Sequence, residues 1–155
     1  PWSGLTRIAG SVPLFFAIFS FHWIGWWAFL PIAIMLVWTL VNPRLFPPPE
    51  SSGHWMTRGV LGERVFLNRE RVPIPTEHAI FARVTTLASV LFVLIAIYGF
   101  WTGQFWTAFA SFFASVAAKV WFVDRMAWLW DEMKDAHPVY RAWSRADWTA
   151  SFDEG

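Results

Sequence analysis

Two charged residues stand where a charge is costly, and they are the first candidates for chemistry in this sequence. Glu63 lies in a segment whose helical wheel places it inside an apolar arc, between Met56 and Gly59. Lys119 lies in a stretch apolar enough to cross a membrane, where a charge costs about 3 kcal/mol on insertion scales. A carboxylate in apolar surroundings is stabilised when an opposite charge faces it. We therefore predict that Glu63 pairs with Lys119 or Arg125.

A wider polar cluster includes this pair and allows two interpretations. Its members are Glu63, Arg64, Lys119, Asp124 and Arg125. As a functional site, the cluster would hold a proton, an ion or a lipid headgroup at the cytoplasmic end of the helices. As a structural clamp, it would fix one helix onto another. The sequence favours the clamp, because it contains no recognisable reaction motif around these residues.

The histidines do not form an evident metal site. They are His22, His54, His78 and His137. None has a second histidine at i+3 or i+4, the spacing that presents two ligands on one helix face. A site on the cytoplasmic side, formed by His54 and His78 with Glu63 or Glu77, stays open as an alternative. The chain has no Cys, which excludes thiolate ligands and nucleophiles. We expect no catalytic residue, no metal and no cofactor, with bound lipid or pigment as the ligands to consider.

The composition is that of a membrane protein. Of 155 residues, 56% are hydrophobic and 15% charged, and 13 Trp and 16 Phe are present. A water-soluble domain of this size could not cover so much aromatic surface. The formal net charge of +1 gives no basic face for nucleic acid. The length allows one domain.

Two long runs without charge define the predicted membrane spans. Residues 8–43 and residues 84–118 contain no Asp, Glu, Lys or Arg. As one straight helix each run would extend roughly 50 Å, against a hydrocarbon core of about 30 Å. Each run should therefore fold into two helices joined by a tight turn. Residues 20–25 and 99–104 are the predicted turns, with Gly99 and Gly103 expected to end a helix.

The predicted fold class is all-α, a polytopic membrane protein with four transmembrane helices in two hairpins. The spans are expected at about 5–21, 24–42, 82–100 and 104–123. The predicted turns carry no Lys or Arg, whereas the segment 44–83 and the residues after 123 carry many. This bias indicates that the central segment and both termini face the cytoplasm, and we expect the bacterial inner membrane as the location.

Tryptophans near both ends of the spans support this topology as two aromatic belts. The belt at the turns would contain Trp23, Trp26, Trp27, Trp101 and Trp106. The opposite belt would contain Trp2, Trp38, Trp55, Trp121, Trp128 and Trp130.

The central segment predicts an amphipathic helix at about 53–70, lying in the cytoplasmic interface. Ser51 or Ser52 is expected to cap its start. Its apolar arc is expected to contain Trp55, Met56, Gly59, Val60, Phe66 and Leu67. Residues 1–134 would then form the transmembrane domain, and residues 135–155 a cytoplasmic tail that is surface-associated and weakly constrained.

Small residues recur every four positions in the last predicted span. One series is Ser111, Ser115 and Lys119, and the other is Ala110, Ala114 and Ala118. Small side chains at this spacing let helices approach closely. A transport path lined by the serines is the alternative, and packing is the interpretation we favour.

Four stretches of the chain resemble an uncharacterised family of small membrane proteins, known only as a domain of unknown function. They are PWSGLTR at 1–7, NPRLFPPP at 42–49, WMTRGVLGERVFLNR at 55–69 and KVWFVDRMAWLW at 119–130. The resemblance extends to about residue 134. It implies a multi-span helical fold and no particular activity. The polar positions that belong to its pattern are Asn42, Arg44, Glu63, Arg64, Lys119 and Asp124.

Two functions follow as hypotheses. The first is a non-catalytic accessory or structural subunit of a larger membrane complex, such as a photosynthetic or respiratory one. Its surplus aromatic surface would pack against partner helices, acyl chains, carotenoid or other pigment, and consists of Phe15, Phe16, Phe19, Phe105, Phe109, Phe112 and Phe113. The second is a small membrane enzyme or transporter with a polar site at the cytoplasmic interface, acting on a lipid-like or ionic substrate through Glu63, Arg64, Lys119 and Asp124. We favour the first, because no reaction motif is present.

Overall fold

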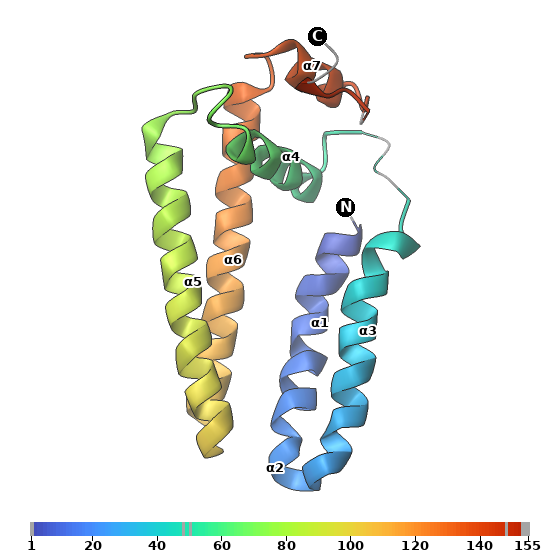
Figure 1. The fold of residues 1–155 in the computed structure, drawn as a ribbon, viewed down its shortest axis with the longest axis vertical. Coiled ribbons are helices and arrows are strands. Elements are labelled where there is room, and N and C mark those ends of the chain that lie inside the picture. The colour runs from blue at the N-terminus through green and yellow to red at the C-terminus, as the bar shows by residue number, and fades with distance from the viewer. Residues whose placement is uncertain (1, 48, 50, 148, 153–155) are drawn as a thin grey trace. The chain divides into compact units, whose positions relative to one another are not determined.

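The computed structural model describes residues 2–47, 49, 51–147 and 149–152. In this part of the chain every regular element is helical, and five helices have thirteen residues or more. In chain order the elements are α1 (Trp2–Phe19), α2 (Phe21–Ile24), the 3-10 helix η1 (Gly25–Ala28), α3 (Phe29–Leu45), α4 (Trp55–Leu67), α5 (Thr76–Thr102), α6 (Phe105–Met133) and α7 (Pro138–Ser144) (Figure 1). The predicted all-α class is confirmed.

Three stretches of the described chain are long and apolar enough to cross a membrane. They are Gly4–Asn42, Thr76–Thr102 and Phe105–Met133. The first is one continuous apolar stretch in the sequence, and it folds as α1, α2, η1 and α3. Large apolar side chains are exposed along α3, among them Leu30, Val37 and Leu40. A helix that is apolar all round fits a lipid environment, so these findings indicate a protein integrated in a membrane.

The chain divides into two compact units, where its length alone suggested one domain. Unit 1 contains Pro48–Thr85 and Val120–Gly155, and unit 2 contains Trp2–Pro47 and Thr86–Lys119. Helices α5 and α6 each contribute residues to both units.

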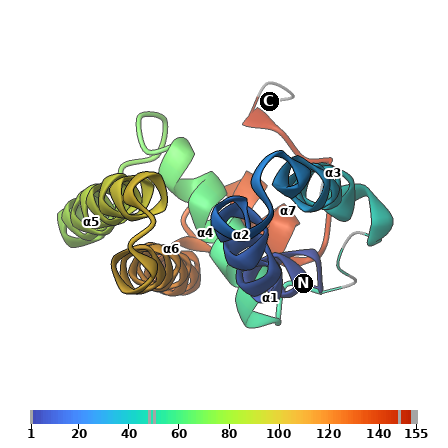
Figure 2. The ribbon, with the colours of Figure 1, turned by 90° about the horizontal axis from the view of Figure 1, so that it is seen from below.

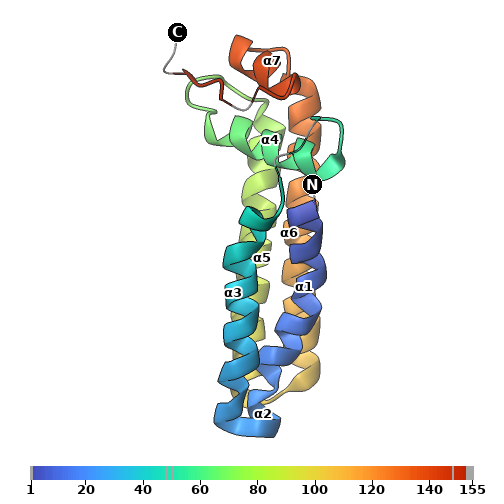
Figure 3. The same cartoon turned by 90° about the vertical axis from the view of Figure 1, so that its right-hand side faces the viewer.

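Unit 2 contains a hairpin of α1 and α3, which lie side by side and run in opposite directions (Figures 1 and 3). Helix α2 and η1 form its tip, where Gly25 has a φ of +56°. Near the open end, Asn42 Nδ2 donates a hydrogen bond of 2.8 Å to Thr6 Oγ1. At the tip, an imidazole nitrogen of His22 is hydrogen-bonded to the carbonyl oxygen of Phe100 on α5. The tips of the two hairpins are therefore joined at the same end of unit 2.

The second hairpin pairs α5 with α6 (Figures 1 and 2). The two predicted turn glycines have different roles. Gly103 follows α5 with a φ of +68°, a conformation that glycine adopts without strain. Gly99 lies inside α5, where a Cβ would stand 2.5 Å from the Ala108 nitrogen of α6. The prediction that Gly99 ends the helix is wrong, because its role is to let the two backbones approach.

The core of unit 2 is a cluster of phenylalanine rings around Phe15. The Phe15 side chain is fully buried. The rings that lie 5.4 to 5.9 Å from it, centroid to centroid, are Phe16, Phe19, Phe100, Phe105, Phe109, Phe112 and Phe113. Aromatic pairs at such distances contribute about 0.5–1.5 kcal/mol beyond the area they bury. This cluster holds α1 against α5 and α6. The expectation that these phenylalanines face partners or pigment is wrong for most of them, because they pack against one another inside unit 2.

The serine and alanine series on α6 are each only partly buried. Ser111 and Ser115 are buried, and the Ser89 hydroxyl of α5 donates to the Ser115 carbonyl at 3.4 Å. The burial of the two serines favours the predicted packing. Ala110 and Lys119 are exposed, so neither series forms a continuous buried stripe.

Three helix boundaries differ from the prediction by five residues or more. Helix α5 begins at Thr76 rather than near 82, and α6 continues to Met133 rather than ending near 123. These extra turns contain charged residues, and Asp131 on α6 is stabilised there by Arg58 from α4. A helix need not end where its apolar run ends if the polar residues beyond have partners. The tip of the first hairpin occupies residues 21–28, so α3 begins at 29 rather than near 24.

Helix α4 is shorter than the predicted 53–70, and a different residue caps it. His54 is the N-cap, and its Nδ1 accepts a hydrogen bond of 3.2 Å from the Met56 N–H. The predicted cap by Ser51 or Ser52 is therefore wrong. The Ser52 hydroxyl instead donates to the Ser144 carbonyl of α7 at 2.8 Å.

The buried face of α4 also differs from the predicted arc. Val60 and Leu67 were placed in the arc but are 49% and 69% exposed. The buried residues are Met56, Thr57, Gly59, Leu61, Gly62 and Val65. The face is rotated because two glycines, not the largest side chains, meet α6.

These glycines set the distance between α4 and α6. A Cβ on Gly62 would overlap the carbonyl oxygen of Met126, and one on Gly59 would lie 3.0 Å from the Val123 carbonyl oxygen. Both obstructing oxygens belong to the backbone of α6. The two helices therefore cross in direct backbone contact.

The segment after residue 134 is more ordered than predicted. Helix α7 buries Tyr140 and Trp143, which are 0% and 5% exposed. They join the core of unit 1 with Met126 and Trp130 of α6. The Trp143 indole N–H donates to the Ala150 carbonyl at 2.9 Å. The expectation of a weakly constrained tail is wrong for these residues, because the tail completes a hydrophobic core.

The close crossing at Gly62 predicts that glycine-to-alanine substitutions lower the free energy of unfolding by different amounts at different positions. Gly62→Ala should lower the free energy of unfolding by about 1–3 kcal/mol, because a backbone oxygen cannot rotate away from the new methyl. Gly59→Ala should cost less, since the Val123 side chain can shift. Gly53→Ala meets nothing closer than 3.9 Å and should stay within about 0.5 kcal/mol of the wild type. Thermal unfolding in detergent measures this order, and equal losses at all three positions would contradict it.

Candidate functional site

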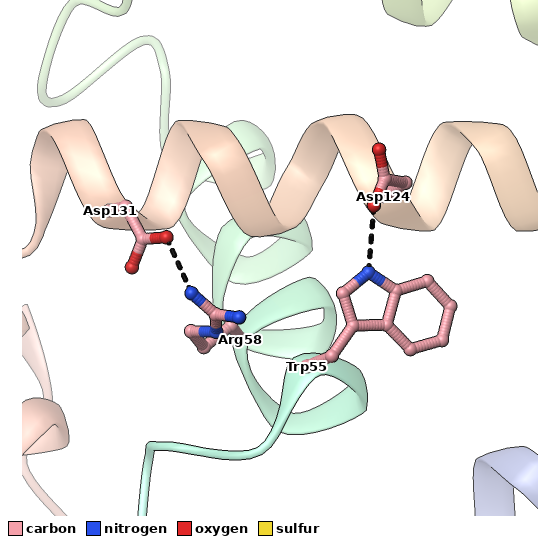
Figure 4. A network of polar contacts seen from close by, with 4 residues as sticks. All are labelled: Trp55, Arg58, Asp124 and Asp131. Atoms are coloured by element: carbon pink, nitrogen blue, oxygen red, sulfur yellow. Dashed lines mark hydrogen bonds and ion pairs between the residues drawn. The ribbon is translucent and has the colours of Figure 1, made fainter.

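The candidate polar site is built on the contact between α4 and α6 in unit 1. The Trp55 indole N–H donates a hydrogen bond of 2.8 Å to Asp124 Oδ1. Arg58 and Asp131 form an ion pair with 2.7 Å between Nη1 and Oδ2. Figure 4 shows both α4 side chains pointing toward α6, each to its own carboxylate.

The sequence spacing explains why these contacts form together. Trp55 and Arg58 are three positions apart on α4, and Asp124 and Asp131 are seven positions apart on α6. With about 3.6 residues per turn, each pair of positions lies on one helix face. The two contacts therefore fix both the rotation of α4 and its position along α6.

The two arginines of the predicted cluster contact aromatic rings. The Arg64 guanidinium lies over the Trp143 ring of α7, 5.5 Å from its centroid. The Arg125 guanidinium lies 4.9 Å from the Phe81 ring of α5 and 4.6 Å from the Trp128 ring. Such contacts are worth about 0.5–1 kcal/mol at exposed sites and more when water is excluded. Arg64 thus connects α4 with α7, and Arg125 connects α6 with α5.

Glu63 and Lys119 belong to different units. Glu63 is half-buried on α4 in unit 1, and Lys119 is exposed on α6 in unit 2. The pairing of Glu63 with Lys119 or Arg125 stays a prediction. Of the five residues in the predicted cluster, Asp124, Arg64 and Arg125 have the contacts given above.

The histidines considered as metal ligands have other partners. His78 is buried on α5, and its Nε2 lies 3.2 Å from Glu132 Oε2 of α6. His54 caps α4. Among the described residues no group of three or more His, Asp or Glu is placed to hold a metal ion.

Several buried polar atoms of the described chain have no hydrogen-bond partner. They are Asn42 Oδ1, Thr57 Oγ1, Arg58 Nε, Arg125 Nε and the Tyr140 hydroxyl. A buried polar group without a partner costs free energy. Burial also raises the pKa of Tyr140, because the phenolate would lose its hydration.

The four stretches that indicated a family are part of a longer match. A family of unknown function, DUF6653, matches residues 1–149. The chain belongs to DUF6653. The match extends past residue 134, the end of the resemblance indicated by the four stretches, and it includes the residues of α7. No curated protein matches the chain, and no solved structure matches it.

Three residues that form contacts between α4 and α6 lie outside the predicted polar cluster. Trp55, Arg58 and Asp131 form two of the polar contacts between α4 and α6. The signal in the sequence is the spacing of three residues between Trp55 and Arg58 and of seven between Asp124 and Asp131. Residues at either spacing lie on the same face of a helix. Which face of α4 meets which face of α6 depends on the glycine crossing, which spacing alone does not reveal.

The two contacts shown in Figure 4 should differ in strength. A hydrogen bond to a charged group contributes about 1.5–3 kcal/mol, so Trp55→Phe should destabilise the fold by an amount in that range. Arg58 and Asp131 are 34% and 42% exposed at the side chain, and their coupling should not exceed about 1 kcal/mol. Double-mutant cycles of Trp55→Phe with Asp124→Ala, and of Arg58→Ala with Asp131→Ala, measure the two couplings by thermal unfolding. A stronger coupling in the second cycle would contradict the geometry.

Tyr140 predicts a loss of stability at alkaline pH. Its raised pKa means that the folded state holds the phenolic proton more tightly than the unfolded state. The stability from this group is present below pH 10.0, the ordinary pKa of tyrosine, and is lost as pH rises above it. Tyr140→Phe should flatten this alkaline decline and leave stability at neutral pH unchanged or slightly higher, because the hydroxyl has no partner. Melting temperatures of both proteins from pH 8 to pH 11 test this, and parallel declines would refute it.

Proposed function

We propose that this protein is a non-catalytic accessory or structural subunit of a larger membrane protein complex. The observation that carries the proposal is the apolar outer surface of unit 2. Large exposed apolar side chains of α3 include Phe29, Leu30, Ile34, Leu36, Val37, Leu40 and Leu45. On α5, within unit 2, they include Leu87, Val90, Leu91 and Leu94. Such a surface is suited to partner helices and lipid acyl chains.

The lengths of the helices support a four-span topology. The first apolar stretch would be roughly 58 Å long as one helix, about twice the hydrocarbon core. Folded as α1 and α3, of 18 and 17 residues, it gives two segments of roughly 26 Å. With α5 and α6 this makes four spans in two hairpins. The absence of Lys and Arg from both hairpin tips supports an outward position for the tips and a cytoplasmic position for both termini.

The contacts of unit 1 support a structural role for the polar cluster. Asp124 accepts from Trp55, and Arg64 and Arg125 lie over rings of neighbouring helices. Each of these side chains thus joins two helices. A catalytic or transport site would require polar groups that converge on a shared space, and these groups are directed to separate partners.

Isolation from the native membrane tests the proposed role. In a mild detergent the full chain should migrate in a species several times its own mass of 17.9 kDa, with a fixed ratio of partner to chain through successive purification steps. Size-exclusion chromatography with light scattering, together with chemical cross-linking before solubilisation, measures both. A stable lone monomer with no cross-linked partner would contradict the proposal.

Glu63→Gln provides the control that separates the two functional hypotheses. If Glu63 is part of a structural clamp, the variant should yield less folded protein, since a neutral side chain cannot form the ion pair. If the cluster is an enzymatic or transport site, the folded amount and membrane insertion should be unchanged. Quantification of folded monomer by gel filtration distinguishes the two results.

A further inference from the structure

Unit 2 contains an open cavity of about 700 Å³ between its two hairpins, and its wall residues Val93 and Ile97 are 43% and 55% exposed. All four long helices contribute to its wall, with Ile18 from α1, Ile32 from α3, Val93 and Ile97 from α5, and Phe112 from α6. Its size lies within the range of about 300–1,000 Å³ that is usual for ligand sites. Because every wall residue belongs to unit 2, the cavity is a property of that unit alone.

The polar side chains of the wall are already engaged. His22 is hydrogen-bonded to the Phe100 carbonyl, which can only accept, so this imidazole nitrogen carries the proton. The Ser115 hydroxyl donates to the Phe112 carbonyl at 2.7 Å. No Asp, Glu, Lys or Arg lines the cavity. The wall therefore presents hydrocarbon and aromatic rings, and it has little to offer a polar ligand.

An apolar cavity of this kind is not expected to hold water, which needs two or more polar partners. Left empty, its wall would lose dispersion contacts over a large area. The cavity also lies between helices long and apolar enough to cross a membrane, where acyl chains are the surrounding medium. Hydrocarbon is thus the occupant that the wall chemistry selects.

The position of the cavity along the helices indicates where a headgroup would lie. From Trp101 to Val93 the wall follows α5 for about 12 Å at 1.5 Å per residue. Trp101 and His22 stand at the hairpin tips, where exposed tryptophans are typical of the membrane interface. Residues 20–28 and 101–107, which form the tips, carry no charged side chain. An anionic headgroup would find no cation there.

We propose that this cavity binds one acyl chain of a zwitterionic phospholipid, whose headgroup lies at the uncharged hairpin tips. The proposal deepens the lipid contacts of the proposed function and rests on the membrane placement of unit 2. It does not require a partner subunit. The bound chain completes the packing between the two hairpins beyond the phenylalanine cluster.

Filling the cavity tests the proposal. Val93→Trp places a larger side chain in the wall, and Ile97→Trp is a second variant one turn along α5. Leu94→Trp is the matched control, since Leu94 is the next residue along α5 and does not line the cavity. The full chain is reconstituted in vesicles of equal parts dioleoylphosphatidylcholine and dioleoylphosphatidylglycerol. It is then extracted in mild detergent, and retained lipid is measured by native mass spectrometry.

The wild type and Leu94→Trp should each retain one phosphatidylcholine per chain, and the two cavity variants at least fivefold less. Circular dichroism and thermal unfolding in the same detergent verify that each variant is folded. If a cavity variant fails to fold, the other decides the result. Preferential retention of phosphatidylglycerol, retention of detergent alone, or equal lipid in all four proteins would overturn the proposal.

The outcome is independent of the subunit question. A lone monomer that retains one phosphatidylcholine would contradict the proposed complex and leave the lipid site intact. A stable complex whose chain retains no lipid would support the proposed complex and contradict the lipid site.

Discussion

Unit 1 depends on the place where α4 crosses α6 at Gly62. The missing side chain allows the α4 backbone to lie directly against the Met126 carbonyl. At that separation Trp55 and Arg58 reach Asp124 and Asp131 directly. A single methyl group at the crossing would separate the two helices and lengthen both contacts. The polar contacts therefore depend on the close packing of the two backbones.

Charge and apolarity are distributed unevenly between the two units. In unit 2 the long helices carry phenylalanines inside and aliphatic residues outside, so lipid can cover the outer surface. In unit 1 the same helices α5 and α6 continue into charged turns, where Asp131 of α6 pairs with Arg58 of α4 and the Arg125 guanidinium of α6 lies over the Phe81 ring of α5. Extending an apolar helix into a polar segment is possible because each added charge finds a partner or remains hydrated. The hydrophobic core around Trp130 and Tyr140 then holds these extensions together.

Much of the fold could be predicted because it follows from local chemistry. The charge-free runs indicated the helices and their turns, and Gly103 marked the end of α5 correctly. The features that were predicted wrongly depend on contacts with other helices. From the sequence, Gly99 is typical of a turn, but in the structure it packs against Ala108 of α6. Ser52 is likewise typical of a helix cap, but its hydroxyl donates to the Ser144 carbonyl. For the polar cluster, the sequence indicated Asp124 as a member, but its partner Trp55 could be assigned only once the two helices were placed.

The sequence by itself determined that the chain is helical and apolar enough to enter a membrane, because backbone groups without water must be satisfied within each segment. It also determined the family, through stretches that extend along most of the chain. The tertiary structure alone decided which helix faces meet and where α7 packs. It also decided that an open apolar cavity lies between the two hairpins of unit 2. These features arise from contacts between residues far apart in the chain, and such contacts leave no periodic signal in either segment alone.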